Sequence, residues 1–354
     1  MNLTQKFFPF RYLVFLLSLM LLIGCNPQVP EPTSSIQPSA TLDSISPETQ
    51  TPTIEAPTPT IIPSQSRVIL VAPPESGLDQ IEELTATLSE LAEAEDMEFE
   101  VRSSFSPQDL SPNLRLLVGV PPDPGLADLA LAAPGTQFLG IAIPELQPAP
   151  NLTVIDTQEI DPGRIGFLAG YLAAVVTPEW RVGVISSNDT TAGVAQRQGF
   201  INGAIFFCGL CRQTYPPFES YPMYVEAPSA SNPQEWLAVG DILIDKAVKT
   251  VYIPPGVGDE SLLEHFAEAG INLIGTAPPP LGIEEQWIAT ITGDISSALR
   301  SAWPELIAGQ SGISVQAPLI LTHINPDLFS PGRQRLVGNL ISELSNGYID
   351  IGVE

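Results

Sequence analysis

Positive charge is scarce in this chain. Its 354 residues include 14 Lys and Arg against 40 Asp and Glu, which gives a formal net charge of −26. Residues 1–24 hold Lys6, Arg11 and no acid, so the charge beyond them is −26 − 2, or −28. Nucleic acid and anionic lipid attract clustered Lys and Arg. The composition therefore argues against a nucleic-acid partner and against a basic patch that binds anionic lipid.

Histidine and cysteine are also rare, with two and three copies in the chain. His265 and His323 lie far apart in the sequence, which argues against a His-rich metal site. Two histidines supply few general bases, and the sequence contains no Gly-x-Ser-x-Gly, no Walker loop and no His-Glu-x-x-His. We therefore expect a binding protein without metal or cofactor, and not an enzyme.

Long apolar runs are missing as well. The run from Tyr12 to Ile23 is interrupted only by Ser18, which makes it much shorter than the roughly 20 residues that span a bilayer. It follows the positive residues Lys6 and Arg11 and ends at Gly24-Cys25, an order typical of a signal peptide. A plain membrane anchor, or a cleaved secretory signal with Cys25 incidental, are the alternatives.

The residues from Leu21 to Cys25 resemble the lipobox of bacterial lipoproteins, roughly Leu-x-Gly/Ala-Cys. This resemblance implies that residues 1–24 are removed and that the Cys25 thiol carries lipid, such as palmitate. Two or three acyl chains would attach the protein stably to a membrane, whereas one chain binds marginally. We therefore expect an extracytoplasmic protein that is lipid-anchored to the cell membrane of a bacterium.

Residues 26–66 form a linker. Of these 41 residues, 23 are Pro, Ser or Thr, a composition that cannot bury enough apolar surface to offset chain entropy. Prolines favour extended polyproline II conformations. Together with Cys25 the segment is interpreted as a stalk that carries a folded domain; a disordered terminus without a function is the alternative.

Beyond residue 66 the sequence alternates between short apolar runs and helical patterns, which is typical of parallel sheets covered by helices. We expect a first lobe over residues 67–160, a second over 161–293, and a final segment over 294–354 that could return to the first. The expected strands are 68–72, 99–101, 114–120, 138–143, 152–155, 181–186, 221–225, 249–253, 271–275, 287–292 and 318–321. The expected helices are 77–94, 125–133, 165–176, 191–207, 233–246, 259–269, 294–307 and 332–345.

One of these helices is apolar on every face. Asp161 is a plausible N-cap with Pro162 at the first helical position, and residues 165–176 follow with almost no polar side chain. A helix that is hydrophobic all round is buried, and this one is too short to cross a membrane. Gly166 and Gly170 lie on a face of small residues that would allow a neighbouring element to approach closely.

From about residue 160 onward the chain resembles the basic membrane protein family of ABC-transporter substrate-binding lipoproteins. That family has the type I periplasmic-binding-protein fold, two lobes that each contain a parallel sheet flanked by helices. The first lobe matches only in pattern. The stretches that carry the resemblance are Gly166-Phe-Leu-Ala-Gly-Tyr-Leu-Ala-Ala174, Arg181-Val-Gly-Val-Ile185, Gln198-Gly-Phe-Ile-Asn-Gly-Ala204 and Ile271-Asn-Leu-Ile-Gly275.

The resemblance implies a binder of nucleoside-like or other small polar solutes, but the ligand-holding positions differ. The family places an Asp and an Asn after the first strand, where this chain has Pro73-Pro74-Glu75-Ser76. It places an acid after the strand that ends here at Gly275 and a lysine after the next one. This chain has Thr276 followed by Ala277 and prolines at the first place and Thr292-Gly293-Asp294 at the second. The resemblance therefore implies the fold more strongly than the nucleoside.

Ligands of such folds bind where loops follow the carboxyl ends of parallel strands. The polar stretch 186–191 opens a helix whose amide groups could bind hydroxyls or an anion, although Asp189 or Thr190 could equally cap that helix. Asp294 is likewise either a ligand contact or an N-cap. The four tryptophans, at 180, 236, 287 and 303, fit packing better than ring stacking. The tentative ligand-binding residues are Glu75, Ser187, Asn188, Asp189, Thr190, Thr276 and Asp294.

Cys208-Gly-Leu-Cys211 is a Cys-x-x-Cys pair at the end of an expected helix. In an exported protein such a pair is expected to form a local disulfide. A redox site would place the first Cys at a helix start, where its pKa falls, and a zinc site would need two further ligands. We therefore predict a structural disulfide.

Together these observations predict a membrane-anchored solute-binding protein of an ABC importer, with a small-molecule ligand and an ABC permease as partners. The alternative is an extracytoplasmic sensory or interaction lipoprotein that kept the fold and lost the transport ligand. The missing acids and lysine favour this alternative.

Overall fold

The computed structural model of the chain describes residues 65–156 and 160–353. The expected signal peptide, Cys25 and almost all of the expected linker lie outside the described residues. Among the described residues, no helix combines the length and apolar character needed to cross a membrane.

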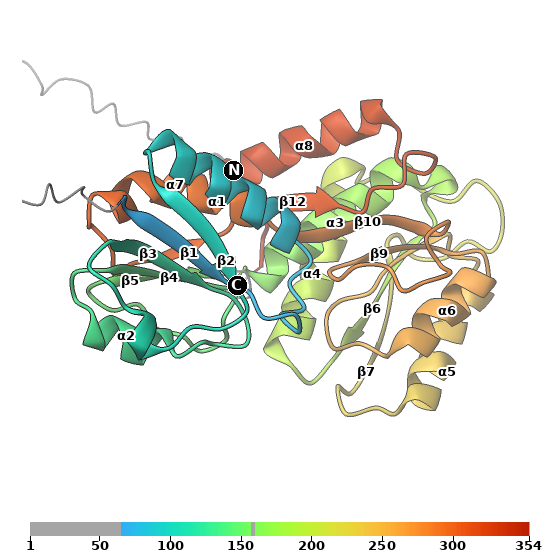
Figure 1. Ribbon diagram of the computed structural model, residues 1–354. Helices are drawn as coiled ribbons and strands as arrows, with labels where there is room; N and C mark the ends of the chain where they lie inside the picture. Colours follow the sequence, from blue (N-terminus) through green and yellow to red (C-terminus); the bar gives the residue numbers. More distant parts are fainter. Residues whose placement is uncertain (1–64, 157–159, 354) are drawn as a thin grey trace, which may run out of the picture. The chain divides into compact units, whose positions relative to one another are not determined.

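The first lobe is built on a six-stranded parallel sheet (Figure 1). Its strand order is β11-β5-β4-β3-β1-β2, so the outer strand β11 comes from a distant part of the chain. The strands are β1 (Arg67–Val71), β2 (Glu98–Arg102), β3 (Leu114–Gly119), β4 (Gln137–Ile141), β5 (Leu152–Asp156) and β11 (Ser314–Gln316). The helices are α1 (Ile81–Ala94), α2 (Leu126–Ala132) and α7 (Ile295–Ile307), with a 3-10 turn η1 at Pro107–Asp109.

The second lobe is built on another six-stranded sheet, in the order β12-β10-β9-β8-β6-β7. All neighbours are parallel except β12, which runs antiparallel to β10. The strands are β6 (Val182–Ser187), β7 (Met223–Ala227), β8 (Thr250–Tyr252), β9 (Asn272–Gly275), β10 (Trp287–Gly293) and β12 (Leu319–Thr322). The helices are α3 (Pro162–Val176), α4 (Thr191–Phe207), α5 (Pro233–Asp245), α6 (Glu260–Glu268) and α8 (Pro331–Ser345), with a 3-10 turn η2 at Pro178–Trp180.

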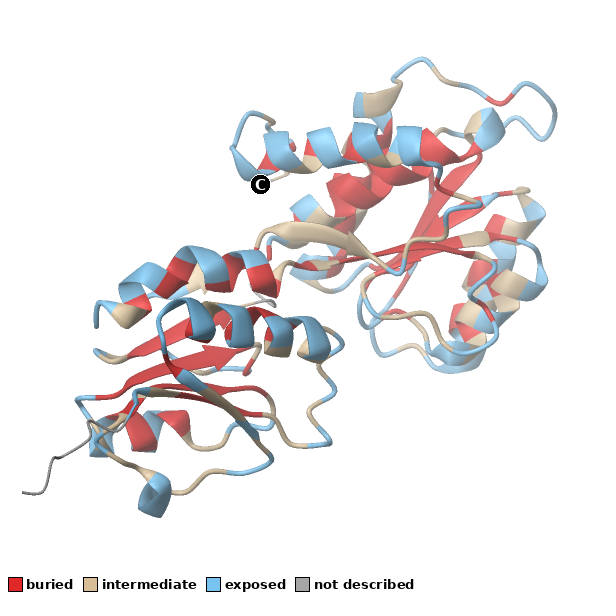
Figure 2. Cartoon of the chain, turned by 45° about the horizontal axis from the view of Figure 1, so that its top comes forward, coloured by how far each residue is buried: buried red, intermediate tan, exposed pale blue. Residues whose placement is uncertain are grey.

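Both sheets are covered on both faces. In the first lobe, Leu70 and Val118 pack beneath α1 and α7, whereas Ile69 and Leu117 pack on the opposite face beneath α2. Figure 2 shows the result, with buried central strands and helices that expose only their outer sides. Strands buried on two faces need continuous apolar runs, which is why the sequence patterns located them.

The helix expected to be buried is α3. The Asp161 side chain accepts a hydrogen bond from the Gly163 amide (2.8 Å), with Pro162 at the first position, as predicted. Its small-residue face meets α4, and a methyl group at Gly166 would lie 2.1 Å from the carbonyl oxygen of Gln196. The two backbones therefore touch, and only glycine fits between them.

The chain passes between the two sheets three times. The passages follow β5, β10 and β11, and they are hydrogen-bonded to one another near their crossing points. The Ala317 amide donates to the Asp156 carbonyl (3.2 Å), and the Asp294 amide donates to the Pro318 carbonyl (2.6 Å). Of the last sixty residues, α7 and β11 belong to the first lobe, whereas β12 and α8 belong to the second.

These features confirm the expected fold class, a two-lobed α/β architecture with mostly parallel sheets flanked by helices. The expected boundaries differ in a few places. Helix α1 begins at Ile81 instead of residue 77, because Gly77 has a positive φ of 61°. Strand β4 ends at Ile141 instead of residue 143, because Ala142 has a φ of 54°. Strand β11 was not expected.

Candidate ligand site

The loops that follow the carboxyl ends of β1, β3 and β4 in the first lobe and of β6, β8 and β9 in the second are the natural ligand-binding positions of this fold. They comprise residues 72–80, 120–125, 142–151, 188–190, 253–259 and 276–286. The tentative residues Glu75, Asn188, Asp189, Thr190 and Thr276 lie on these loops, and Ser187 ends the strand before one of them.

The loop between β6 and α4 is held by its own polar side chains. The Ser187 and Thr190 hydroxyls are 2.6 Å apart, and the Thr190 hydroxyl also accepts from the Gly193 amide (3.0 Å). Thr190, not Asp189, is therefore the N-cap of α4. The Asp189 carboxylate instead accepts hydrogen bonds from the amide (2.8 Å) and hydroxyl (3.1 Å) of Ser229. These bonds fix the loop to the one that follows β7.

A hollow of about 420 Å³ opens beside this loop. Its polar wall includes the tentative residues Asn188, Asp189 and Thr190. The first two turns of α4 and two residues near the end of the chain complete it. The additional lining residues are Thr191, Val194, Ala195, Gln198, Gly352 and Val353. A hollow of this size, with a few polar groups around aliphatic side chains, fits a small polar organic molecule.

The C-terminal wall of the hollow is fastened to α4. The Asn202 side-chain amide donates to the carbonyl oxygens of Ile351 (2.8 Å) and Gly352 (3.1 Å). Gln198, itself a lining residue, donates to the Asn202 side-chain oxygen (2.9 Å). Sequence reasoning missed this wall, because residues 346–353 show no periodic pattern and their partner Asn202 is about 150 positions away. The local signals are two glycines, Gly347 and Gly352, whose φ angles are 70° and 64°.

The other tentative residues lie elsewhere. Glu75 is exposed in the turn after β1, and Thr276 is half-buried after β9. Asp294 caps α7, because its carboxylate accepts from the amide (2.8 Å) and hydroxyl (2.7 Å) of Ser297. Ser187 is buried behind Thr190. None of these four lines the hollow beside α4.

The carboxyl-end loops carry charge of one sign. They contain eight acids and no Lys, Arg or His, so an anionic ligand would find no ion-pair partner on them. The nearest arginine on α4, Arg197, already pairs with Glu226 and lies over the Tyr224 ring. The amides of the lining residue Thr191 and of its neighbour Ala192 have no hydrogen-bond partner within the described part of the chain. The free amides can donate to a hydroxyl or carbonyl oxygen of a solute, whereas an anion would also meet the Asp189 carboxylate without a basic partner on these loops.

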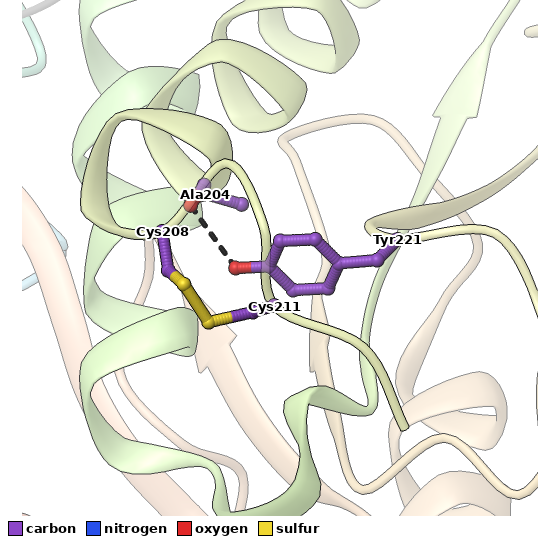
Figure 3. The surroundings of a disulfide bond; sticks show 4 residues. All are labelled: Ala204, Cys208, Cys211 and Tyr221. Atoms are coloured by element: carbon purple, nitrogen blue, oxygen red, sulfur yellow. Dashed lines mark hydrogen bonds between the residues drawn. A yellow bond between two sulfur atoms is a disulfide. The ribbon is translucent and has the colours of Figure 1, made fainter. Parts of the chain in front are cut away.

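The structure pairs Cys208 with Cys211 in a disulfide directly after α4 (Figure 3). The Tyr221 hydroxyl packs near it and donates to the Ala204 carbonyl (3.0 Å), and burial raises the pKa of Tyr221 to about 12. No lining residue of the hollow belongs to this region. Among residues 65–156 and 160–353, no three His, Cys, Asp or Glu side chains are grouped so as to hold a metal ion.

No protein-family model matches this sequence, and no curated protein matches it either. The structure is similar to that of an ABC transporter system solute-binding protein from Conexibacter woesei DSM 14684, with a TM-score of 0.57 and 19% identity over 80% of this chain and 98% of that one. At this identity the similarity shows the fold alone. It agrees with the type I periplasmic-binding-protein architecture described above.

Two further solved structures align with lower scores. AraP, an arabinose-binding protein from Geobacillus stearothermophilus, has a TM-score of 0.45 and 14% identity over 78% of this chain and 99% of that one. A putative transcription regulation repressor of the LacI family from Corynebacterium glutamicum has a TM-score of 0.38 and 13% identity over 73% and 97% of the two chains. Because both TM-scores are below 0.5, we draw no conclusion about this chain from these two structures.

Proposed function

We propose that this protein is a lipid-anchored, extracytoplasmic solute-binding protein that captures a small polar molecule and delivers it to an ABC permease. The observation that carries the proposal is the hollow beside the β6–α4 loop, which lies at the carboxyl end of the second sheet and is lined by Asn188, Asp189 and Thr190. The shared fold with the Conexibacter solute-binding protein supports the same role.

The charge of the carboxyl-end loops limits the class of ligand that the site could bind. Hydroxyl and amide groups line the hollow, and its single charged side chain is the carboxylate of Asp189. A desolvated anion without an ion-pair partner is costly to bind. We therefore propose a neutral or cationic ligand, such as a nucleoside, a sugar or an amine, in preference to a phosphate ester or carboxylate. The nucleoside follows only from the resemblance to the basic membrane protein family.

The lipid anchor completes the proposed mechanism. An acylated Cys25 would keep the domain close to its permease, so that the second encounter takes place at a raised effective concentration. Ligand that contacts both lobes would favour the closed arrangement over the open one. The first step rests on the sequence of residues 1–66, and the second rests on the two-lobed fold.

An extracytoplasmic sensory or interaction lipoprotein is the second candidate. It is favoured by one observation, the absence of the acid expected after Gly275 and of the lysine expected after β10. Such a protein would keep the fold and the membrane anchor without a transported ligand.

A thermal-shift screen with the chain from residue 26 onward tests the proposal. The compounds are nucleosides, sugars, amines and amino acids, with nucleoside monophosphates as anionic counterparts. A ligand at about 100 times its Kd stabilises the native state by about 2.7 kcal/mol, which raises Tm by about 5 °C or more. We expect such a shift for a neutral or cationic compound, and a smaller one for its phosphorylated form.

Two matched variants locate the site. Val194→Trp fills the hollow and should abolish the shift, whereas Ile242→Trp introduces the same side chain at a similarly exposed helical position on α5 and should preserve it. If no compound raises Tm, the sensory or interaction lipoprotein becomes the favoured function. A shift that survives in Val194→Trp would place the site elsewhere.

A further inference from the structure

The loop between α4 and β7 presents large apolar side chains to solvent. Leu210 is 91% exposed, Phe218 71%, Tyr215 63% and Phe206, in the last turn of α4, 53%. Isolated apolar side chains on a surface need no explanation, but four within thirteen residues form a candidate interaction surface.

This exposure is structurally enforced. The Cys208–Cys211 disulfide closes the start of the loop, and Tyr221 ties its end to α4 through Ala204 (Figure 3). Arg181 holds the middle of the loop in place, because its buried guanidinium donates hydrogen bonds to the carbonyl oxygens of Tyr215 (2.6 Å) and Pro217 (3.2 Å). A surface that is already ordered loses little conformational entropy when it binds, which favours association.

The charge around the loop differs from that of the rest of the chain. Between residues 205 and 222 the only charged residues are Arg212 and Glu219, and Glu219 pairs with Lys246 (3.1 Å). Lys249 is exposed near the loop, since its amide bonds to the Arg181 carbonyl (2.8 Å). Neither Arg212 nor Lys249 forms an ion pair within the described residues, while Asp245 is the unpaired acid next to Lys246. The loop and its neighbour Lys249 therefore present two cations that are unpaired within the described part of the chain, although the chain as a whole has a charge of −26.

We infer that residues 205–222 form a contact site for the surface of a phospholipid bilayer. Leu210 and Phe218 enter the apolar boundary, Tyr215 lies at headgroup level as tyrosines do at membrane interfaces, and Arg212 and Lys249 meet lipid phosphate oxygens. Apolar insertion supplies the attraction, so the scarcity of basic residues elsewhere does not oppose it. Charged groups farther away than about 8 Å are screened at physiological salt.

A bilayer suits this surface better than a protein partner because its most exposed side chains are apolar and, within the described residues, its unpaired ions are the cations Arg212 and Lys249. The proposed lipid anchor would hold the loop near a membrane continuously, so that a weak contact suffices. The contact would set how the domain is presented to a membrane partner. It does not depend on the ligand site.

Vesicle flotation tests this inference with the chain from residue 26 onward, which lacks Cys25 and therefore any acyl chain. The probe is large vesicles of phosphatidylcholine at physiological ionic strength. We expect measurable association, and a loss of at least about tenfold in the partition coefficient for the double variant Leu210→Ser/Phe218→Ser. Leu281→Ser is the matched control, because Leu281 is also 91% exposed but lies on the loop after β9.

A second measurement separates insertion from mere adhesion. In the variant Phe218→Trp, fluorescence in excess of the native tryptophans should shift to the blue with vesicles and be quenched by brominated lipid. Circular dichroism and thermal melting verify that each variant is folded. The inference is overturned if the chain does not float with vesicles, or if the double variant binds like Leu281→Ser. It is also overturned if size-exclusion chromatography with light scattering shows a dimer that the double variant abolishes, since the loop would then bind a second copy.

Discussion

Gly170 on α3 faces the backbone of Phe200 on α4 so closely that a methyl group on it would lie 2.0 Å from the Phe200 carbonyl oxygen. The contact is reciprocal, because a methyl group at Gly203 on α4 would lie 1.9 Å from the carbonyl oxygen of Phe167 on α3. The two helices therefore pack backbone against backbone, and they position the α4 turns that line the hollow.

Gly170→Ala should force α3 and α4 apart. Because the clashing atoms belong to the backbone, we expect a loss of about 1–3 kcal/mol in the free energy of unfolding, or more if the helices cannot separate. Gly338→Ala on α8 is the matched control, since its added methyl group meets nothing within 4 Å. That change should stabilise the protein by about 0.5–1 kcal/mol through helix propensity. Urea denaturation of both variants measures the difference; equal effects would contradict the packing.

A buried tyrosine and a half-buried one should respond in opposite ways to loss of their hydroxyl groups. The Tyr252 hydroxyl is buried and has no hydrogen-bond partner among the described residues, although its ring stacks on Phe200. Tyr252→Phe should therefore stabilise the protein by about 1 kcal/mol, by removing a desolvated polar group. Tyr221→Phe breaks the bond to Ala204 and should cost about 1 kcal/mol. Thermal or urea unfolding near neutral pH compares the two variants.

The pH dependence of stability at alkaline pH tests the burial of Tyr221 and Tyr252. Burial raises the pKa of Tyr221 from 10.0 to about 12 and also raises that of Tyr252. A raised pKa means that the unfolded state loses the proton first, so stability is complete below pH 10 and declines as the pH rises through 12. Each Phe variant should show a shallower decline than the native protein in that range. An unchanged slope in Tyr221→Phe would contradict the burial of its hydroxyl group.

Asn202→Ala should release the C-terminal wall of the hollow. The change removes both hydrogen bonds to Ile351 and Gly352, so we expect faster amide hydrogen exchange in residues 349–353 and a stability loss of about 1 kcal/mol. Gln198→Ala serves as the comparison, because it removes only the bond that orients Asn202. Its effect on exchange should be smaller. If exchange is the same in both variants and in the native protein, the wall is held by other contacts.

Acid should weaken the junction between β1 and β2. Arg102 donates a hydrogen bond to Glu100 (2.6 Å) and, with Arg67, lowers the Glu100 pKa below 4.5. The stabilisation is therefore complete above pH 4.5 and is lost as the pH falls through the lower folded-state pKa. Glu100→Gln should reduce the difference between urea midpoints measured on the two sides of pH 4.5. Glu93→Gln, which removes an exposed charge that forms no ion pair in the described part of the chain, is the control.

Local sequence signals located most of the fold. Asp161-Pro162 and the apolar residues behind them specify α3 without any tertiary information, and Gly166 and Gly170 indicated its close contact. Strand β11 was missed because Ser314–Gln316 is short and half-exposed, and its identity depends on pairing with β5 more than 150 residues earlier. A local sequence pattern cannot reveal pairing between strands that lie so far apart in the chain.

Only the part of the candidate site that is formed by residues adjacent in the sequence could be predicted. The polar run after β6 indicated Asn188, Asp189 and Thr190, and these residues do share one hollow. The choice between Asp189 and Thr190 as helix cap depended on Ser229, which Asp189 engages instead. The wall at Gly352 and Val353 depends on contacts between residues far apart in the sequence, so no local motif predicts it.

The three passages between the sheets have a consequence for how the chain is made. Helix α7 covers one face of the first sheet and β11 completes its edge, yet both follow the strands of the second lobe up to β10 in the sequence. An emerging chain that has reached Gly293 still lacks α7, one of the two helices that cover Leu70 and Val118. The first lobe therefore stays partly uncovered until the greater part of the second has left the ribosome, and a chain cut short at that point is a substrate for proteases.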